Sequence, residues 1–381
     1  MRSAEIREKF LNFFKDRGHT IVSSSSLVPE GDSSVLFTTA GMQQFKPHFI
    51  GLKSAKEDFG SLNLASCQKC VRTSDIEEVG DASHLTFFEM LGNFSFGGYW
   101  KKEAIEYAHE FITKVMDLKI DYVSVFKGEG NVPEDKESEE IWKSIDSNII
   151  VKKFGRADNF WGPTGEEGPC GPTTEIYVEG IEIWNIVFNE YYQNKDASLK
   201  PLTTRGVDTG MGLERLVKVV QKVETVFEMD LFLPIMWAAG SRIVSDHIRT
   251  SCFMISDGVT PSNTDRGYIL RRLLRRAYMK NKNMNPVIDA VINHPSYQGL
   301  YAFSPDIKEI VAQELKKFQK TLDAGLKQVE KGEDPFILFT SYGLPLEIIE
   351  EVVKVDKEKF AEQMEEHQNL SRAAAEQKFK K

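Results

Sequence analysis

The spacing of apolar residues divides the chain into two parts with different periodicity. Near the N-terminus, apolar residues recur every three or four positions between Ser3 and Gly18, at Ile6, Phe10, Phe13 and Phe14. This spacing predicts an opening helix between those two residues, and similar spacing predicts a helix over residues 101–118. In the rest of the chain up to about residue 235, short β-favouring runs predict strands at residues 35–39, 85–90, 122–126, 149–154, 174–179 and 181–188.

After Pro234, nearly every apolar run follows the 3.6-residue period of a helix, and residues 306–331 carry a long example. The pattern therefore predicts an α+β fold. We expect residues 1–239 to form a mixed sheet flanked by helices, and residues 240–381 to form an all-helical domain.

The composition indicates a chain with a sizeable core and no membrane span. Of 381 residues, 41% are hydrophobic and 28% are charged. No apolar run approaches the roughly 18 residues of a transmembrane helix, and the amphipathic N-terminal helix is unlike a secretory leader. We therefore expect a cytoplasmic protein. A net charge of −9 argues against nonspecific binding to nucleic acid, although it does not exclude a local basic surface.

Four cysteines are too few for a disulfide framework. Cys67 and Cys70 form a CxxC pair, but no second pair of metal ligands follows at a matching spacing. We therefore expect no zinc site. The alternative, in which the chain is a metal or redox protein, predicts that Cys67→Ser abolishes function.

Residues 207–215 read Val-Asp-Thr-Gly-Met-Gly-Leu-Glu-Arg and lie between a strand-like run and a helical pattern. Asp208 is suited to hold a cation such as an amino group, and Gly210 and Gly212 leave room for a ligand to approach the backbone. Arg215, in the first helical turn, is suited to an anion or a flat base. A simple glycine turn with an exposed Glu–Arg pair fits the same residues, because short glycine motifs match many unrelated sites.

Three upstream segments supply further binding chemistry. Residues 68–75 and 86–97 predict a strand, a loop and a Phe-rich strand, with Arg72 on one side and aromatic rings on the other. An arginine beside a ring suits a nucleoside triphosphate, because the guanidinium grips a phosphate and the ring covers the base. Residues 158–161 and 182–188 add Trp and Asn side chains. Each segment alone is explained by core packing, but all of them together with the glycine motif are not.

Residues 266–282 carry seven arginines and lysines. On a helix, Arg271 and Arg275 share one row while Arg272 and Arg276 share another, so we expect at least one row to face solvent and contact RNA phosphates. The alternative is a helix whose arginines are only solvated while its leucines pack inward. The two descriptions are compatible.

The sequence resembles the alanyl-tRNA synthetases, a family of class II aminoacyl-tRNA synthetases, over nearly its whole length. The resemblance is carried by the segments above and by residues 10–14, 24–29, 36–46, 246–249, 257–263 and 266–277. Among these runs are Leu-Phe-Thr-Thr-Ala-Gly-Met and Asp-His-Ile-Arg. The resemblance implies an antiparallel six-stranded sheet, followed by a helical domain that recognises the acceptor stem of a tRNA.

The resemblance also implies alanine–tRNA ligase activity. ATP and L-alanine would condense to alanyl-adenylate and pyrophosphate, and the alanyl group would then move to the 3′ end of tRNA(Ala). Arg72 and Arg215 would be the catalytic residues. By analogy Arg72 grips the α-phosphate and the alanine carboxylate, Phe94 covers the adenine, Arg215 covers its other face, and Asp208 binds the ammonium of alanine. Mg²⁺ is expected with ATP, held largely by the nucleotide itself.

The implied binding residues fall into three sets. ATP is expected to contact Arg72, Phe94, Trp161, Ile183, Trp184, Asn185, Gly212 and Arg215. L-Alanine is expected to contact Trp161, Asn185 and Asp208. tRNA is expected to contact Arg249, Arg271, Arg272, Arg275, Arg276, Asn281 and Asn283. Either asparagine is a candidate reader of a G·U pair in the acceptor stem.

Several positions depart from the family pattern. The loop after Arg72 is shortened to residues 73–75, and Leu85 stands where the family has a histidine that contacts ATP. We therefore expect weaker triphosphate binding, seen as a raised KM for ATP. Thr340 replaces an acidic residue that reads the acceptor stem in the family, which leaves the reading of the G·U pair open.

Family members commonly continue into an editing domain and a C-terminal domain, whereas this chain ends soon after Gly343. We therefore expect no editing, charging with glycine and serine as well as alanine, and a monomer. A further alternative is a catalytically silent relative that binds tRNA with a steep salt dependence and forms no adenylate. The retained residues Arg72, Asn185, Asp208 and Arg215 argue against it.

Overall fold

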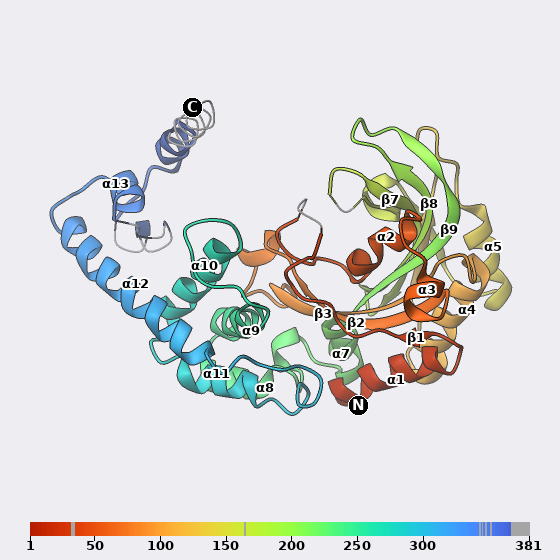
Figure 1. The fold of residues 1–381 in the computed structure, drawn as a ribbon, viewed down its shortest axis with the longest axis horizontal. Helices are drawn as coiled ribbons and strands as arrows, with labels where there is room; N and C mark the ends of the chain where they lie inside the picture. Colours follow the sequence, from red (N-terminus) through yellow and green to blue (C-terminus); the bar gives the residue numbers. More distant parts are fainter. Residues whose placement is uncertain are drawn as a thin grey trace.

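A curved, nine-stranded sheet forms one half of the molecule (Figure 1). The computed structural model describes residues 1–31, 35–163, 165–342, 344, 346, 349–350 and 353–366, and counts of strands and helices refer to these residues. The strands are β1 (Thr20–Ile21), β2 (Asn63–Val71), β3 (Phe87–Ser95), β4 (Tyr122–Phe126), β5 (Val151–Phe154), β6 (Phe160–Trp161), β7 (Gly168–Val178), β8 (Ile181–Gln193) and β9 (Leu199–Gly212).

The centre of this sheet is antiparallel. The strands are hydrogen-bonded in the order β1-β2-β3-β9-β8-β7-β4-β5, and β6 pairs with β7 outside this path. Each neighbouring pair from β2 to β4 is antiparallel, which confirms the six-stranded sheet that the resemblance implies. β1 and β5 each add a parallel strand at one edge.

The first part of the chain supplies helices to both faces of the sheet. They are α1 (Ser3–Lys15), α2 (Lys46–Phe49), α3 (Ala55–Phe59), α4 (Lys101–Glu110), α5 (Lys136–Ile145), α6 (Arg156–Asn159) and α7 (Leu213–Gln221). In Figure 1, α1, α4 and α5 lie along the outer side of the curve, and α2 lies inside it. The predicted opening helix is confirmed as α1, and the helix predicted at residues 101–118 is confirmed as α4 with its π-helical continuation, η3 (Phe111–Val115).

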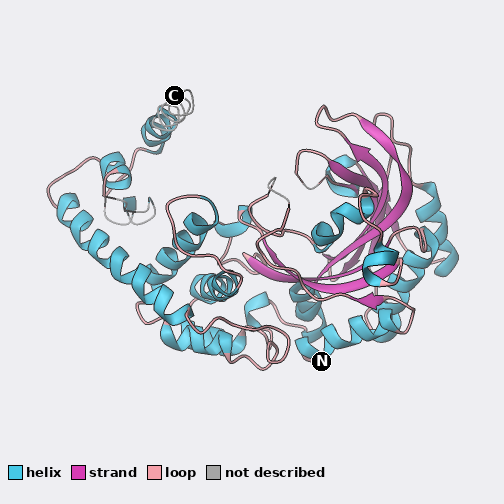
Figure 2. Cartoon of the chain, in the orientation of Figure 1, coloured by secondary structure: helices cyan, strands magenta, loops and turns pink. Residues whose placement is uncertain are grey.

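The second part of the chain is helical, as Figure 2 shows. Its helices are α8 (Leu233–Ala239), α9 (Arg242–Ser256), α10 (Asp265–Lys280), α11 (Asn285–Ile292), α12 (Ile307–Val329) and α13 (Pro335–Thr340). The domain boundary between residues 239 and 240 stays a prediction. Gly343 and residues 367–381 lie outside the described residues. In the part of the chain that the structure describes, every helix is too short or too polar to cross a lipid bilayer.

One of the predicted strands is wrong, and several observed strands are longer than predicted. Residues 35–39 are a loop, and the strand beside it is β2, of which the sequence predicts only the end, from residue 68 onward. β2 is buried on both faces and includes the polar Gln68 and Lys69, so it lacks the alternation that marks a half-buried strand. β9 is also longer than its sequence suggests, because Pro201 and several glycines disfavour a strand. Residues 207–212 are therefore the end of β9, not a turn.

A buried ionic cluster joins the sheet to helices from both parts of the chain. Arg7 on α1 donates to Glu89 on β3, with 2.7 Å between Nη2 and Oε2. Arg249 on α9 donates to Glu214 on α7, with 2.5 Å between Nη2 and Oε1, and to the carbonyl of Phe87 at 2.8 Å. Glu89 completes the cluster, because its backbone N–H donates to the Glu214 carboxylate at 3.0 Å. α1, β3, α7 and α9 therefore share one charged core, which fixes α9 against the sheet.

Candidate active site

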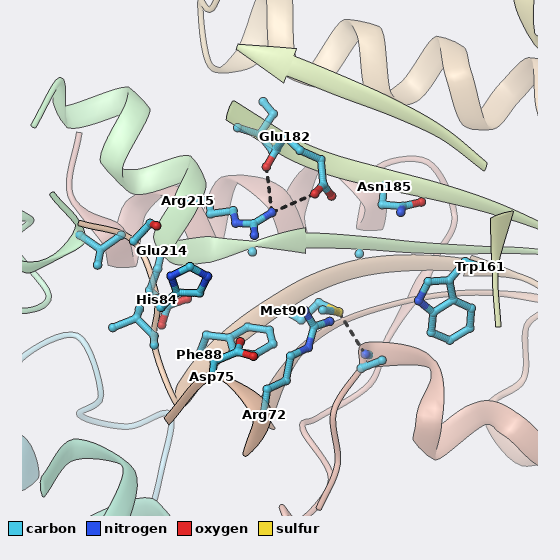
Figure 3. A pocket seen from close by; sticks show the side chains of 18 of the residues that line it. Arg72, Asp75, His84, Phe88, Met90, Trp161, Glu182, Asn185, Glu214 and Arg215 are labelled. Carbon is cyan, nitrogen blue, oxygen red and sulfur yellow. Dashed lines mark hydrogen bonds and ion pairs between the residues drawn. The ribbon is translucent and has the colours of Figure 1, made fainter. Parts of the chain in front are cut away.

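A pocket of about 270 Å³ opens on the face of the sheet formed by β3, β9 and β8. It gathers seven of the nine residues predicted to bind ATP or alanine, namely Arg72, Trp161, Ile183, Asn185, Asp208, Gly212 and Arg215. In Figure 3, Arg215 and His84 lie toward one side of this pocket, Trp161 and Asn185 toward the other, and Arg72 and Phe88 between them. Residues from distant parts of the chain thus meet because the register of three strands brings them together.

Asp208 is a buried carboxylate that has no partner in the part of the chain that the structure describes. It lies on β9 opposite Val187 on β8 and Phe94 on β3, and only 5% of its surface is exposed. Its carboxylate accepts no hydrogen bond from the described residues and lies in the pocket wall. Burial raises the pKa of Asp208 to about 8. A buried carboxylate is costly unless it is paired, so this position favours a ligand that brings a positive charge.

Asn185 stands next to Asp208 on the same face of the sheet. It pairs with Gly210 while Asp208 pairs with Val187, so the two side chains are diagonal neighbours across β8 and β9. The Asn185 amide nitrogen donates to Oε1 of Glu175 at 3.2 Å. Its amide oxygen is buried and has no hydrogen-bond partner among the described residues. Asp208 and Asn185 therefore present unpartnered acceptors to one region of the pocket.

Glu175 on β7 sets the orientation of the Asn185 amide. Its carboxylate also accepts from Ser124 Oγ at 3.0 Å and from Tyr177 Oη at 2.8 Å. Burial, and then the nearby charge of Glu182, raises the pKa of Glu175 to about 7. Because a carboxylate only accepts hydrogen bonds, it holds the nitrogen of Asn185 toward β7 and turns the oxygen away from it.

Arg215 enters the pocket from the first turn of α7. Gly212 is the N-cap of that helix, where a Cβ atom would come no nearer than 3.8 Å to the Arg215 side chain. The guanidinium donates to the carbonyl of Glu182 at 3.2 Å and to its carboxylate at 3.0 Å. Because 48% of the side chain is exposed, Arg215 keeps donors that can face a ligand.

Arg72 lies in the middle of the pocket beside an aromatic ring that the sequence analysis did not select. Its Nε donates weakly to the carbonyl of Thr39 at 3.4 Å, and it makes no ion pair within the described residues. The guanidinium lies 5.0 Å from the centre of the Phe88 ring. Arginine and ring therefore form the pair expected of a nucleotide site, with Phe88 in the place predicted for Phe94.

The structure places Phe94 and Trp184 in the core and not in the pocket. Phe94 is fully buried, and its ring lies 4.7 Å from that of Phe45. Trp184 is 1% exposed and packs on the outer side of the sheet, 5.8 Å from the rings of Phe10 and Phe111. A ring stacked on adenine needs an open face, so we leave both residues out of the proposed ATP site.

The register of β2 and β3 identifies Phe88 as the ring beside Arg72, which the periodicity of the sequence could not do. Phe88 and Phe94 differ by six positions, so alternation puts both on the same face of β3. Val71 pairs with Phe87, which sets Arg72 next to Phe88, whereas Phe94 pairs with Leu64. Nearness to Arg72 along the paired strands is the signal that separates the two rings.

The loop between β2 and β3 closes one side of the pocket. Asp75, Ser83, His84 and Leu85 line the wall there. Nδ1 of His84 lies 2.6 Å from the carboxylate of Asp81. Leu85 is 6% exposed and contributes an apolar wall at the position where the family has a histidine.

Cys67 and Cys70 do not form a metal or redox pair. They are three residues apart on β2, so their side chains point to opposite faces of the sheet. Both thiols are free and buried, and burial raises the pKa of each. Among the described residues, no three His, Cys, Asp or Glu side chains converge as metal ligands do.

The arginines predicted to bind tRNA are already engaged with carboxylates. Arg275 on α10 donates to Glu314 on α12 at 2.9 Å, and Arg271 lies 3.0 Å from the same Glu314 oxygen. On the other row, Arg272 and Arg276 pair with Glu77 in the β2–β3 loop. The two rows therefore hold α10 between α12 and the loop.

Arg249 is not on this surface. Its side chain is fully buried in the ionic cluster, and its three nitrogens donate to Tyr297, Phe87 and Glu214. Phosphate contacts require an accessible guanidinium, so we leave Arg249 out of the proposed RNA surface and assign it to the core.

The groove between α10, α11 and α12 offers polar and basic side chains instead. It has a volume of about 450 Å³ and includes Tyr278, Lys282, Asn283, Asn285, Lys316, Gln319 and Lys320. Lys316 and Lys320 are exposed and make no ion pair within the described residues. Of the two candidate asparagines, Asn283 lines the groove, whereas the Asn281 amide donates to the carbonyl of Ala239 at 3.1 Å. Thr340 Oγ1 donates within α13, to the carbonyl of Phe336 at 2.8 Å.

Comparison with known proteins finds relatives that match nearly the whole chain. Residues 5–381 match the family model described as tRNA synthetases class II (A). An alanine–tRNA ligase of Rubrobacter xylanophilus is 39% identical over 99% of this chain and 50% of its own length. That of Thermotoga maritima is 42% identical over 98% of this chain and 50% of its own length. That of Treponema denticola is 39% identical over 99% of this chain and 74% of its own length. The chain thus spans about half the length of the first two of these curated relatives.

Proposed function

This chain belongs to the class II tRNA synthetases (A), in the alanine–tRNA ligase family, and from that premise we propose that it activates L-alanine with ATP and transfers it to tRNA. The observation that carries the proposal is Asp208, a buried carboxylate that has no partner among the described residues and lies in the wall of a pocket that also holds Arg72 and Arg215. An amino acid with a free ammonium satisfies the first group, and a nucleoside triphosphate satisfies the other two.

In the proposed reaction the pocket works by positioning and by charge stabilisation. Asp208 and the Asn185 amide oxygen hold the ammonium of alanine, which leaves the carboxylate free to attack the α-phosphorus of ATP. A carboxylate oxygen bonds to phosphorus while the bond to the β-phosphate bridging oxygen breaks, and pyrophosphate leaves. Arg72 offsets the charge on the phosphate, Phe88 and Arg215 hold the base from two sides, and Trp161 closes the alanine end.

Mg²⁺ accompanies the polyphosphate in this proposal. The pocket contains Glu182, whose carboxylate already binds Arg215, and Asp75 in the β2–β3 loop. One or two carboxylates suit Mg²⁺ when phosphate oxygens and water complete its octahedron. The residues present therefore fit a cation that arrives with ATP and takes most of its ligands from the nucleotide.

For tRNA, we propose that the acceptor stem lies over the groove between α10 and α12. Asn283, Lys282, Lys316 and Lys320 offer donors and positive charge there without an opposing carboxylate in the groove. Arg271, Arg272, Arg275 and Arg276 would reach RNA only by exchanging a carboxylate for a phosphate. Contacts to phosphates give affinity that falls steeply with salt.

The test is alanine-dependent exchange of pyrophosphate into ATP, followed by charging of tRNA(Ala). We expect exchange with L-alanine and its near loss in Asp208→Ala, with circular dichroism showing that the variant is folded. Asp289→Ala, on the distant surface of α11, is the matched control and should retain exchange. A folded protein that binds tRNA without any exchange would instead be a silent relative.

A further inference from the structure

The β2–β3 loop, which closes one side of the pocket, is held from outside by the helical half of the molecule. Five of its residues, Arg72, Asp75, Ser83, His84 and Leu85, face the pocket. The backbone between them is bound by side chains of α9 and α10. A loop that lines the pocket on one side and binds α9 and α10 on the other can couple the position of these helices to the position of the pocket residues.

Three separate anchors hold the loop. At its start, Arg276 on α10 donates to the carbonyl of Ile76 at 2.8 Å. In its middle, Arg242 on α9 donates to the carbonyls of Gly80 and Asp81 at 3.2 and 3.0 Å. At its end, the N–H of Thr86 donates to the carboxylate of Asp246 on α9 at 2.8 Å.

Arg276 anchors the part of the loop that contains Asp75. Ile76 belongs to η2 (Ser74–Ile76), and η2 also contains Asp75, which lines the pocket. The Arg276 side chain is only 14% exposed, and its guanidinium lies 3.3 Å from the carboxylate of Glu77, which Arg272 also binds. Arg276 therefore grips two consecutive loop residues, one through the backbone and one through the side chain. A planar guanidinium can do this, whereas an ammonium cannot hold both in a fixed geometry.

We propose that Arg276 is a positioning residue for ATP: it fixes η2, and hence the ATP-facing side of the β2–β3 loop, to helix α10. Arg276 does not line the pocket and acts only through the loop. Arg72 directly follows β2, so the contact bears mainly on Asp75, which lies in η2 beside Ile76. The kinetic test of this inference, by pyrophosphate exchange, rests on the proposed function. The structural test, by hydrogen exchange, does not.

The chain offers a closely matched control in Arg17. Arg17 donates to the carbonyl of Phe13 at 2.9 Å and to the carboxylate of Glu110 at 2.7 Å, and 25% of its side chain is exposed. It thus makes the same two kinds of contact as Arg276, at a similar depth. It lies between α1 and α4, outside the pocket.

The experiment compares Arg276→Ala with Arg17→Ala in pyrophosphate exchange. We expect Arg276→Ala to raise the KM for ATP about tenfold, the effect of losing a charge-assisted hydrogen bond, with the KM for alanine changed less than about twofold. Arg17→Ala should leave both KM values near wild type. Equal effects of the two variants on the KM for ATP would overturn the proposal, as would an unchanged KM in Arg276→Ala.

Hydrogen exchange of the loop gives a second readout that needs no activity. Amides of residues 73–86 should exchange faster in Arg276→Ala than in wild type or Arg17→Ala, while amides of α9 stay protected. If Arg276→Ala does not fold, Glu77→Gln tests the same contact and should increase loop exchange by a smaller factor. Unchanged loop exchange in the folded variant would refute the role of Arg276. If wild type shows no pyrophosphate exchange, the proposed function fails while hydrogen exchange still decides this inference.

Discussion

The residues of the pocket on the sheet were implied mainly by the family resemblance and the basic face of α10 was predicted from helical spacing, and the structure places the two sets in different surroundings. In the pocket, seven of nine selected residues meet around one cavity. On α10, the four selected arginines face Glu314 on one side and Glu77 on the other. The pocket residues include groups without a partner among the described residues, whereas the charges of the α10 arginines are neutralised by carboxylates of the same chain.

The difference shows what spacing can and cannot determine. Strand register determines which side chains lie next to each other. A buried polar group without a hydrogen-bond partner in the protein either binds a ligand or lowers the stability of the fold. Helical spacing determines only which arginines lie in the same row of the helix. It does not determine which side chains of other elements pack against that row. Charge density in a sequence is therefore a weaker guide to a binding surface than an unsatisfied group in a structure.

The largest effect on activity is expected when the charge of Asp208 is removed while the shape of its side chain is kept. We expect Asp208→Asn to lower kcat/KM for alanine by about 100-fold or more, because the ammonium loses its counter-charge. Pyrophosphate exchange at varied alanine concentration measures this. An activity within a few-fold of wild type would show that the unpartnered carboxylate is not the ammonium site.

The same variant should be more stable at alkaline pH. Burial raises the pKa of Asp208 from its ordinary 3.8 to about 8, so the folded state holds a proton that the unfolded chain has released. The contribution of this group to stability is present below about pH 4 and is lost as the pH rises through 8. Urea unfolding at pH 6 and pH 8.5 should therefore show a decline for wild type that is smaller in Asp208→Asn.

A second prediction separates the ring in the pocket from the ring in the core. Phe94→Ala should lower the free energy of unfolding by about 3–5 kcal/mol, the usual cost of a large cavity. Phe88→Ala should leave the fold nearly as stable and raise the KM for ATP about tenfold, as expected for a lost stacking contact. Denaturant titration and exchange kinetics on both variants test the assignment, and the reverse pattern would restore Phe94 as the adenine contact.

A third prediction concerns the orientation of Asn185. Glu175→Gln keeps the size of the side chain but allows an N–H to face Asn185, so the amide can turn its oxygen away from the pocket. We expect the KM for alanine to rise about two- to tenfold, the range of one hydrogen bond, with the KM for ATP unchanged. Equal rises in both constants would indicate a general disturbance of the pocket.

The smallest expected effect concerns the helical half. Replacing Lys316 and Lys320 by Ala should lower the slope of log binding constant against log salt for an acceptor-stem RNA by about two. The matched control replaces Lys114 and Lys119, which are exposed near the sheet. Filter binding across a salt series measures the slopes. A larger loss from Arg271→Ala with Arg275→Ala would mean that RNA displaces Glu314 and that the predicted arginine rows bind it.

Much of the architecture was accessible from periodicity, because α1, α12 and the first part of β8 have regular apolar spacing. β2 was predicted only at its end, since both its faces are buried and Gln68 and Lys69 interrupt its apolar run. In the site, Asp208 and Asn185 were selected correctly as pocket residues, whereas Phe94 was preferred to Phe88. The strand pairs that separate those rings, such as Val71 with Phe87, link residues far apart in sequence, and no local pattern encodes them.

The ionic cluster of Arg7, Glu89, Glu214 and Arg249 has a consequence for how such a protein can change by recombination. Removing one of these side chains leaves a buried charge of opposite sign without its partner, which lowers the free energy of unfolding by about 3–5 kcal/mol. A gene fusion or crossover near residue 240 would separate Arg249 from Glu214 and fail in most backgrounds. The sheet and helix α9 should therefore be inherited as a unit, and exchange of the remaining helical part is expected to succeed only at junctions downstream of α9.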